Sequence, residues 1–130
     1  MANYIDILKK LNKKCINDIP ISCIIVKNNK IISKGYNNKY NKNDPLGHAE
    51  INAIKKASKK LKSANLNDCI LYVTLKPCKM CQEVIQECRI KKVYYYLDNN
   101  KNINNTVTYI KLDEKNNFEE NIINFFKQKR

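Results

Sequence analysis

The chain has 130 residues, of which 43% are hydrophobic, and a formal net charge of +13. This length and hydrophobic content predict one domain, residues 1–130, around a single core, and exclude an intrinsically disordered protein. No apolar run approaches the roughly 18 residues that a membrane-spanning helix needs. The lysine-bearing segment 1–14 lacks the apolar core of a secretion signal, so we expect a cytoplasmic protein.

The positive charge comes from 25 Lys and Arg residues against 12 Asp and Glu residues. Such a field attracts polyanions, among them RNA. Lys, Asn and Ile are also the residues that an AT-rich genome imposes on any protein. Net charge alone therefore identifies no binding site.

The first part of the chain predicts a helix followed by a β-hairpin. Apolar residues recur at three- and four-residue steps from Tyr4 to about Lys14, with Asn3 as a candidate N-cap. The β-branched run Ile21–Val26 is typical of a buried strand. Asn28-Asn29 then predicts a turn into a second strand around Ile31–Ser33.

The middle of the chain alternates between helical and strand patterns. A polar loop, 35–47, precedes a helix from about His48 to Lys62, whose outer face is rich in lysine. The run Cys69–Leu75 is almost continuously apolar, as in a central strand that is covered on both sides. Pro77 then favours a helix start, and Cys78 to about Cys88 continues as helix.

The last third predicts two more strands and a closing helix. The strands are expected at Val93–Leu97 and Val107–Leu112, and the helix from Phe118 to about Lys129. Helices between strands imply crossover connections and a sheet packed between helical layers. We therefore expect an α/β fold with three layers.

Two short motifs carry the residues best suited to chemistry. His48 and Glu50 lie in His-Ala-Glu, and Cys78 and Cys81 lie in Pro-Cys-Lys-Met-Cys. One imidazole and two thiolates are ligands that zinc prefers, and a catalytic zinc site keeps its fourth position for water. Glu50 is then placed to carry protons beside that water.

Each half of the pattern also has an ordinary explanation. A lone C-x-x-C also occurs in structural zinc and redox sites, and Glu50 alone is a usual first-turn acid. Together the motifs match the H-x-E and P-C-x-x-C signature of zinc nucleobase deaminases. The sequence thus predicts one zinc ion per chain and hydrolysis of an amidine-like C–NH2 group. The other cysteines are interpreted as small buried hydrophobic residues: Cys15, Cys23, Cys69 and Cys88.

The chain resembles the bacterial tRNA-specific adenosine deaminases, within the cytidine deaminase-like superfamily. The resemblance covers nearly the whole chain, and its most specific motifs are Gly35-Tyr36-Asn37, Asp44-Pro45-Leu46-Gly47-His48-Ala49-Glu50, Leu71–Cys81 and Phe125-Phe126-Lys127. It implies a three-layer α/β/α fold with a five-stranded mixed sheet and a homodimer. It also implies conversion of adenosine to inosine at the anticodon wobble position, with arginine tRNA as the expected partner.

The resemblance further implies roles for individual residues. Asn37 would contact the target base, and the backbone of Ala49 would read its edge. The terminal aromatic and basic residues suit stacking and phosphate contacts with RNA. These expected RNA-binding residues are Phe125, Phe126, Lys127 and Arg130.

Two departures and two alternative functions accompany this interpretation. The family usually has Glu at the position of Lys76, and segment 98–106 is short and rich in Asn where the family has a longer one. A deaminase of free guanine, cytosine or their nucleosides would use the same zinc ligands. A non-catalytic subunit with structural zinc is the other alternative, but it has no need of Glu50.

Overall fold

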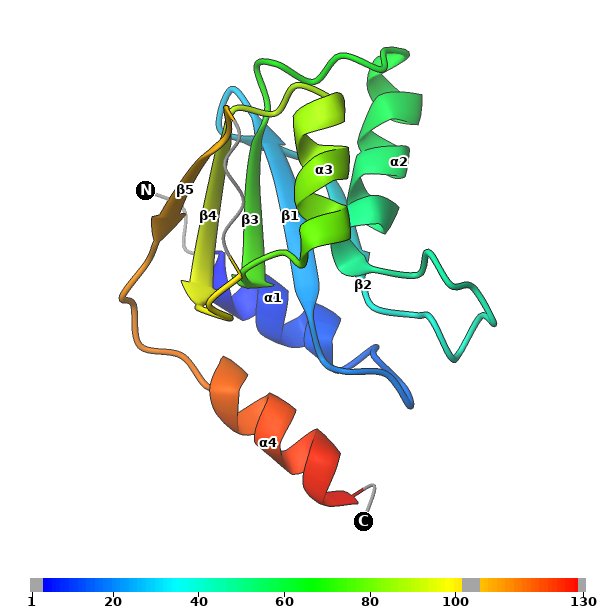
Figure 1. Cartoon of the computed structure of the whole chain (residues 1–130), viewed down its shortest axis with the longest axis vertical. Coiled ribbons are helices and arrows are strands. Elements are labelled where there is room, and N and C mark those ends of the chain that lie inside the picture. The colour runs from blue at the N-terminus through cyan, green and yellow to red at the C-terminus, as the bar shows by residue number, and fades with distance from the viewer. Residues whose placement is uncertain (1–3, 102–105, 129–130) are drawn as a thin grey trace.

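The computed structural model describes residues 4–101 and 106–128. A five-stranded sheet in the order β2-β1-β3-β4-β5 forms its centre (Figure 1). The elements in chain order are α1 Ile5–Asn12, β1 Ser22–Lys27, β2 Lys30–Tyr36, α2 Ala49–Leu61, β3 Ile70–Leu75, α3 Lys79–Glu87, β4 Lys92–Leu97, β5 Thr108–Lys111 and α4 Phe118–Gln128.

The sheet is mixed, as the resemblance implied. β1 is antiparallel to both β2 and β3, whereas β3 is parallel to β4 and β4 is parallel to β5. The β1–β2 connection is the expected hairpin, since Asn28 and Asn29 both have positive φ, 51° and 62°. Two successive positive φ angles are typical of the type I′ turn, which matches the twist of the strands.

Helices cover both faces of the sheet, which confirms the three-layer α/β/α architecture. α2 and α3 lie on one face and α1 lies on the other (Figure 1). The first core cluster joins α2 and α3 to buried residues of β1, β3 and β4, such as Cys23, Leu71 and Val93. The second joins α1 to the opposite side of the sheet and includes Leu8 and Phe118.

Element boundaries differ from the expected ones by a few residues. α1 ends at Asn12, and the candidate N-cap Asn3 lies outside the described residues. α3 begins at Lys79 with Cys78 as its N-cap, so Pro77 stands just before the helix. Among the cysteines interpreted as buried, Cys15 is only partly buried, whereas the remaining three are buried as expected. Within the described ranges, every helix is too short or too polar to cross a bilayer.

Candidate metal centre

The three expected zinc ligands meet at the N-terminal ends of two helices. His48 is the N-cap of α2 and Cys78 is the N-cap of α3, both with extended backbone. Cys81 follows in the first turn of α3 and is fully buried. The ligand atoms of the three side chains all lie within 4.8 Å of one another. Both helices begin at the end of the sheet where β3 and β4 finish (Figure 1).

The arrangement fits a tetrahedral zinc ion. Bonds of about 2.3 Å to sulfur and about 2.0 Å to nitrogen place two such ligand atoms about 3.5 Å apart at the tetrahedral angle. The observed separation of Cys81 Sγ from His48 Nδ1 is 3.7 Å. Two thiolates, one imidazole and one remaining position are the donor set of catalytic zinc sites.

The neighbours of Cys78 favour its thiolate form. The pKa of Cys78 is lowered to about 5, chiefly by a hydrogen bond from the Cys81 thiol and further by backbone N–H groups in the first turn of α3 and by His48. The same contact and burial raise the pKa of Cys81. The lowered pKa of Cys78 favours its thiolate, the form in which cysteine binds metal.

Glu50 lies beside the ligands without belonging to them. Its side chain is only 4% exposed, on the inner face of α2. Burial is the largest effect on its carboxyl and raises the pKa to about 7, while a hydrogen bond with Cys81 acts in the opposite direction. The carboxyl is therefore in contact with the metal centre and remains outside the three-residue ligand group. Its role as proton carrier stays a prediction.

Asn37 and Ala49, the expected substrate contacts, bind each other. The Ala49 N–H donates to Asn37 Oδ1 at 2.9 Å, and Asn37 Nδ2 donates to the carbonyl of Ile19 at 3.1 Å. Asn37 thereby satisfies one of the N–H groups that a helix leaves unpaired at its start. Among the bonds of the described residues, Asn37 keeps its second Nδ2 hydrogen and the second lone pair of Oδ1 for a base. Contact of either residue with a base stays a prediction.

The loop between β2 and α2 is held by residues that the sequence analysis did not single out. The buried carboxylate of Asp18 accepts hydrogen bonds from the backbone N–H groups of Tyr40 and Asn41, at 2.9 and 3.2 Å. Asn52 Nδ2 donates to the carbonyl of Tyr36 and to Asn38 Oδ1. These are isolated Asp and Asn residues in polar surroundings, so no sequence pattern identifies them.

A glycine sets the distance between β2 and α2. A Cβ at Gly35 would overlap the carbonyl oxygen of Ala49 and lie 2.7 Å from the Ala53 nitrogen. Only a residue without a side chain permits this approach, so Gly35 lets α2 bring His48 to the metal centre.

The turn before the first cysteine ligand is also braced. Gln82 Nε2 donates to the carbonyls of Pro77 and Lys101, at 2.8 and 2.9 Å. Asn99 Nδ2 donates to the carbonyl of Lys76 at 2.6 Å. The described part of the short Asn-rich segment is therefore tied to the residues that position Cys78.

Lys76, the departure from the family pattern, is buried between aromatic rings. Its side chain is 7% exposed. Its Nζ lies 5.5 Å from the ring centroid of Tyr95 and 5.8 Å from that of Tyr109. Both distances suit cation–π attraction. The positive charge is thus accommodated locally, and no metal ligand is affected.

Three of the expected RNA-binding residues, Phe125, Phe126 and Lys127, lie on α4, below the end of the sheet where α2 and α3 begin (Figure 1). Phe125 is partly buried, whereas Phe126 is 49% exposed, and their rings make an edge-on contact at 5.2 Å. Lys127 is exposed, and Arg130 lies outside the described residues. In α4 only Phe118 is buried, so most of the apolar side of this helix is partly or fully open to solvent.

Several curated proteins are similar to this chain in sequence. It is 46% identical over 87 residues to a tRNA-specific adenosine deaminase of Rickettsia bellii and 47% identical over 76 residues to a guanine deaminase of Bacillus subtilis. These alignments cover 65% and 58% of this chain, and the chain spans only 60% and 49% of the two relatives. A tRNA-specific adenosine deaminase of Buchnera aphidicola is 36% identical over 126 residues, covering 87% of this chain and 83% of that protein.

Solved structures confirm the fold. A structure from a study of tRNA A34 deaminases superposes with a TM-score of 0.73 at 24% identity, over 83% of this chain and 92% of that one. The Bacillus subtilis guanine deaminase gives 0.67 at 39% identity, over 75% and 66%.

The zinc-binding region itself matches a known family. Residues 2–97 match the sequence profile of the cytidine and deoxycytidylate deaminase zinc-binding region. This range contains His48, Cys78 and Cys81, whose geometry fits zinc, so the zinc site expected from the sequence is confirmed. The chain belongs to the cytidine and deoxycytidylate deaminase family.

Proposed function

We propose that the chain is a zinc-dependent hydrolytic deaminase that converts adenosine to inosine at the wobble position of a tRNA anticodon. The observation that carries the proposal is the buried carboxyl of Glu50, in contact with Cys81 yet outside the ligand group. A structural metal site has no need of such a group. A hydrolytic one needs a proton carrier within reach of the attacking water.

Three residues bind the metal, and a fourth transfers protons. Zinc, when bound by His48, Cys78 and Cys81, supplies the Lewis acidity that makes a water nucleophilic near neutral pH. A carboxylate oxygen of Glu50 accepts the proton of the attacking water and passes it to the ring nitrogen beside the amino-bearing carbon. Glu50 then transfers the second proton to the amino group, which leaves as ammonia while the ring carbon becomes a carbonyl. Water is consumed, and no other reactant is needed.

The base is held at the start of α2. The bonds from Ala49 N–H and to the Ile19 carbonyl fix the orientation of the Asn37 amide, so its remaining Nδ2 hydrogen is directed to one place. A fixed donor of this kind discriminates between bases without losing rotamer freedom on binding.

Features outside the metal centre favour RNA over a free base. The chain carries a charge of +13. The half-exposed ring of Phe126 and the exposed Lys127 lie on α4, at the end of the molecule that holds the metal centre. Exposed aromatic rings stack on unpaired bases, and lysines contact phosphates. An anticodon base is unpaired, so it can reach the metal centre at little unstacking cost.

Guanine is the second candidate substrate. The similarity to the Bacillus subtilis guanine deaminase is as high as that to the tRNA-specific enzymes, at 47% identity over 76 residues. The same ligands and the same proton carrier serve both reactions, so the metal centre alone does not distinguish them.

Partners and compartment follow from the leading candidate. We expect arginine tRNA as the substrate and a homodimer as the assembly, acting in the cytoplasm. The six free cysteines are compatible with a reducing compartment.

The test compares the candidate substrates under one set of conditions. The zinc-loaded protein is incubated with an arginine-tRNA anticodon stem-loop and, separately, with guanine, cytosine and cytidine, and a Glu50→Gln sample serves as the blank. Inosine at the wobble position, found by nucleoside analysis, supports the proposal. Ammonia released from guanine with no inosine in the RNA assigns the chain to the second candidate.

A further inference from the structure

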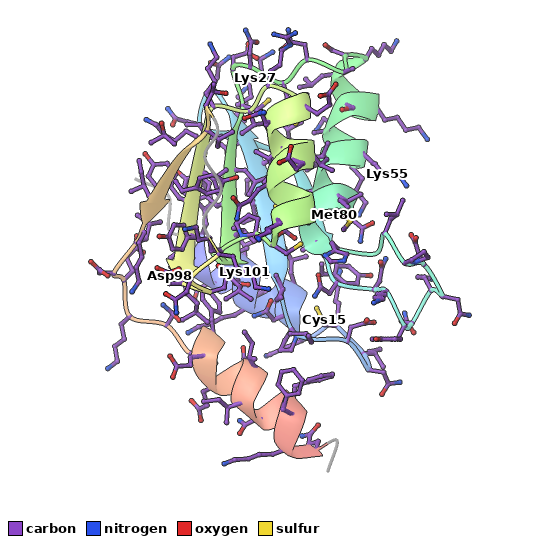
Figure 2. All side chains as sticks on the ribbon, viewed as in Figure 1. Cys15, Lys27, Lys55, Met80, Asp98 and Lys101 are labelled. Carbon is purple, nitrogen blue, oxygen red and sulfur yellow. The ribbon has the colours of Figure 1, made fainter. Side chains whose placement is uncertain are left out.

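The outer face of α2 carries four lysines arranged as two stacked pairs. Lys55 and Lys59 are four residues apart, as are Lys56 and Lys60, and all four are exposed. Residues at this spacing lie one above the other on a helix. Figure 2 shows Lys55 on the side of α2 that points away from the sheet. We call these four residues the α2 lysine face.

No acidic residue of the helix balances this charge. The only acid of α2 is Glu50, which is buried on the opposite side. Within the described ranges none of the four lysines forms an ion pair; Lys56 Nζ instead donates to the carbonyl of Lys34 at 3.3 Å. Like charges at this spacing destabilise a helix. The helix dipole offsets this for Lys59 and Lys60 in the last turn, but not for Lys55 and Lys56 near mid-helix.

The α2 lysine face starts close to the metal centre. His48 caps the same helix, and a rise of 1.5 Å per residue places Lys55 about 10 Å and Lys60 about 18 Å farther along the axis. A ligand whose reacting base lies at His48 can therefore extend along this helix. Because α2 is one continuous helix packed on the sheet, its geometry sets the spacing between the site and the lysines.

The chemistry of this surface selects its partner. None of the large hydrophobic side chains that are exposed in the described residues lies on α2. Such a surface offers nothing to an apolar protein groove or to the acyl region of a membrane. Lysine is a flexible point charge suited to single phosphates, and sequence-independent RNA binding consists of such contacts.

We propose that the α2 lysine face binds the phosphate backbone of an RNA stem whose unpaired loop delivers the base to the metal centre. This inference rests on the proposed function and adds a second, sequence-independent contact to it. It also leaves this face outside the core of a homodimer, since two copies meeting there would bring like charges together.

The experiment compares two variants that each lose four lysines. Glutamine removes the charge and preserves helix propensity. The test variant is Lys55→Gln, Lys56→Gln, Lys59→Gln, Lys60→Gln. The control, at the end of the sheet opposite the metal centre, is Lys27→Gln, Lys30→Gln, Lys91→Gln, Lys92→Gln. Affinity for the anticodon stem-loop is measured over a range of salt, with zinc content and melting temperature checked for every sample.

The test variant is expected to reduce the slope of log affinity against log salt by about three units, since each lost phosphate contact removes somewhat less than one. In the control variant, this slope is expected to differ from that of the wild type by less than one unit. A single-stranded oligonucleotide of the loop sequence should bind the test variant and the wild type alike, because it has no stem.

An equal reduction of the salt slope in the two variants would overturn the inference, because RNA affinity would then depend on net charge and not on the α2 lysine face. An unchanged salt slope in the test variant would also overturn the inference. So would a test variant that binds RNA like the wild type but no longer binds phosphatidylserine vesicles. If the wild type edits the stem-loop in these cases, the proposed function stands without the inference. A wild type that deaminates guanine and neither binds nor edits RNA refutes both.

Discussion

Asn37 allows the structural and binding roles of one side chain to be separated. Its Oδ1 accepts the N–H of Ala49, a residue with no exposed surface, and its Nδ2 donates to the carbonyl of Ile19. Asn37→Ala leaves the buried N–H without a partner, which costs about 1–3 kcal/mol of the free energy of unfolding. For a chain of this length, each kcal/mol corresponds to about 4 °C in melting temperature.

Asn37→Asp is the matched control because it keeps the acceptor and removes the donor. The carboxylate can still accept the Ala49 N–H at the positive end of α2, so this bond and the zinc are expected to be retained. The bond from Nδ2 to the Ile19 carbonyl is lost in both variants. It cannot donate to a base, so turnover should fall in both variants, whereas the Ala49 N–H loses its partner only in Asn37→Ala.

The assays are urea unfolding at equal zinc content and the rate of inosine formation. An Asn37→Ala variant as stable as the wild type would contradict the assigned role at the start of α2. An Asn37→Asp variant with wild-type turnover would show that the Nδ2 group does not contact the base.

Four further predictions concern the metal centre and its surroundings. Glu50→Gln should retain zinc and melting temperature but lose turnover by a factor of about 10² to 10⁴, the usual contribution of a general acid–base group; wild-type rates would place the proton carrier elsewhere. Cys78→Ser combined with Cys81→Ser should abolish stoichiometric zinc in metal analysis, because one imidazole is insufficient to hold it. Removal of residues 125–130 should weaken RNA binding more than zinc retention, provided that circular dichroism shows a folded protein; unchanged RNA affinity would contradict the role assigned to α4. Lys76→Met should lower the free energy of unfolding by about 0.5–2 kcal/mol through loss of its contacts with two rings, measured by urea titration.

The elements and the metal ligands could be predicted from the sequence because both are encoded locally. The apolar run before Pro77 is long enough to indicate a covered strand, and Asn28-Asn29 indicates a tight turn whatever the rest of the chain does. Cys78 and Cys81 lie on the same side of a helix start because of their spacing alone. The chemistry of one imidazole, two thiols and one carboxylate then limits the site to a small set of functions.

The neighbours of the site were decided by packing between distant segments. Asp18 meets Tyr40 and Asn41 more than twenty positions away, and Lys76 meets the rings of Tyr95 and Tyr109. No periodicity encodes such pairs, since each forms only when the sheet brings separate segments together. The same holds for Asn37: a sequence motif placed it near a base, and the tertiary structure showed its Oδ1 bound to the start of α2. The sequence determines which chemical groups the side chains carry. The contact partner of each side chain depends on which segments the fold brings together.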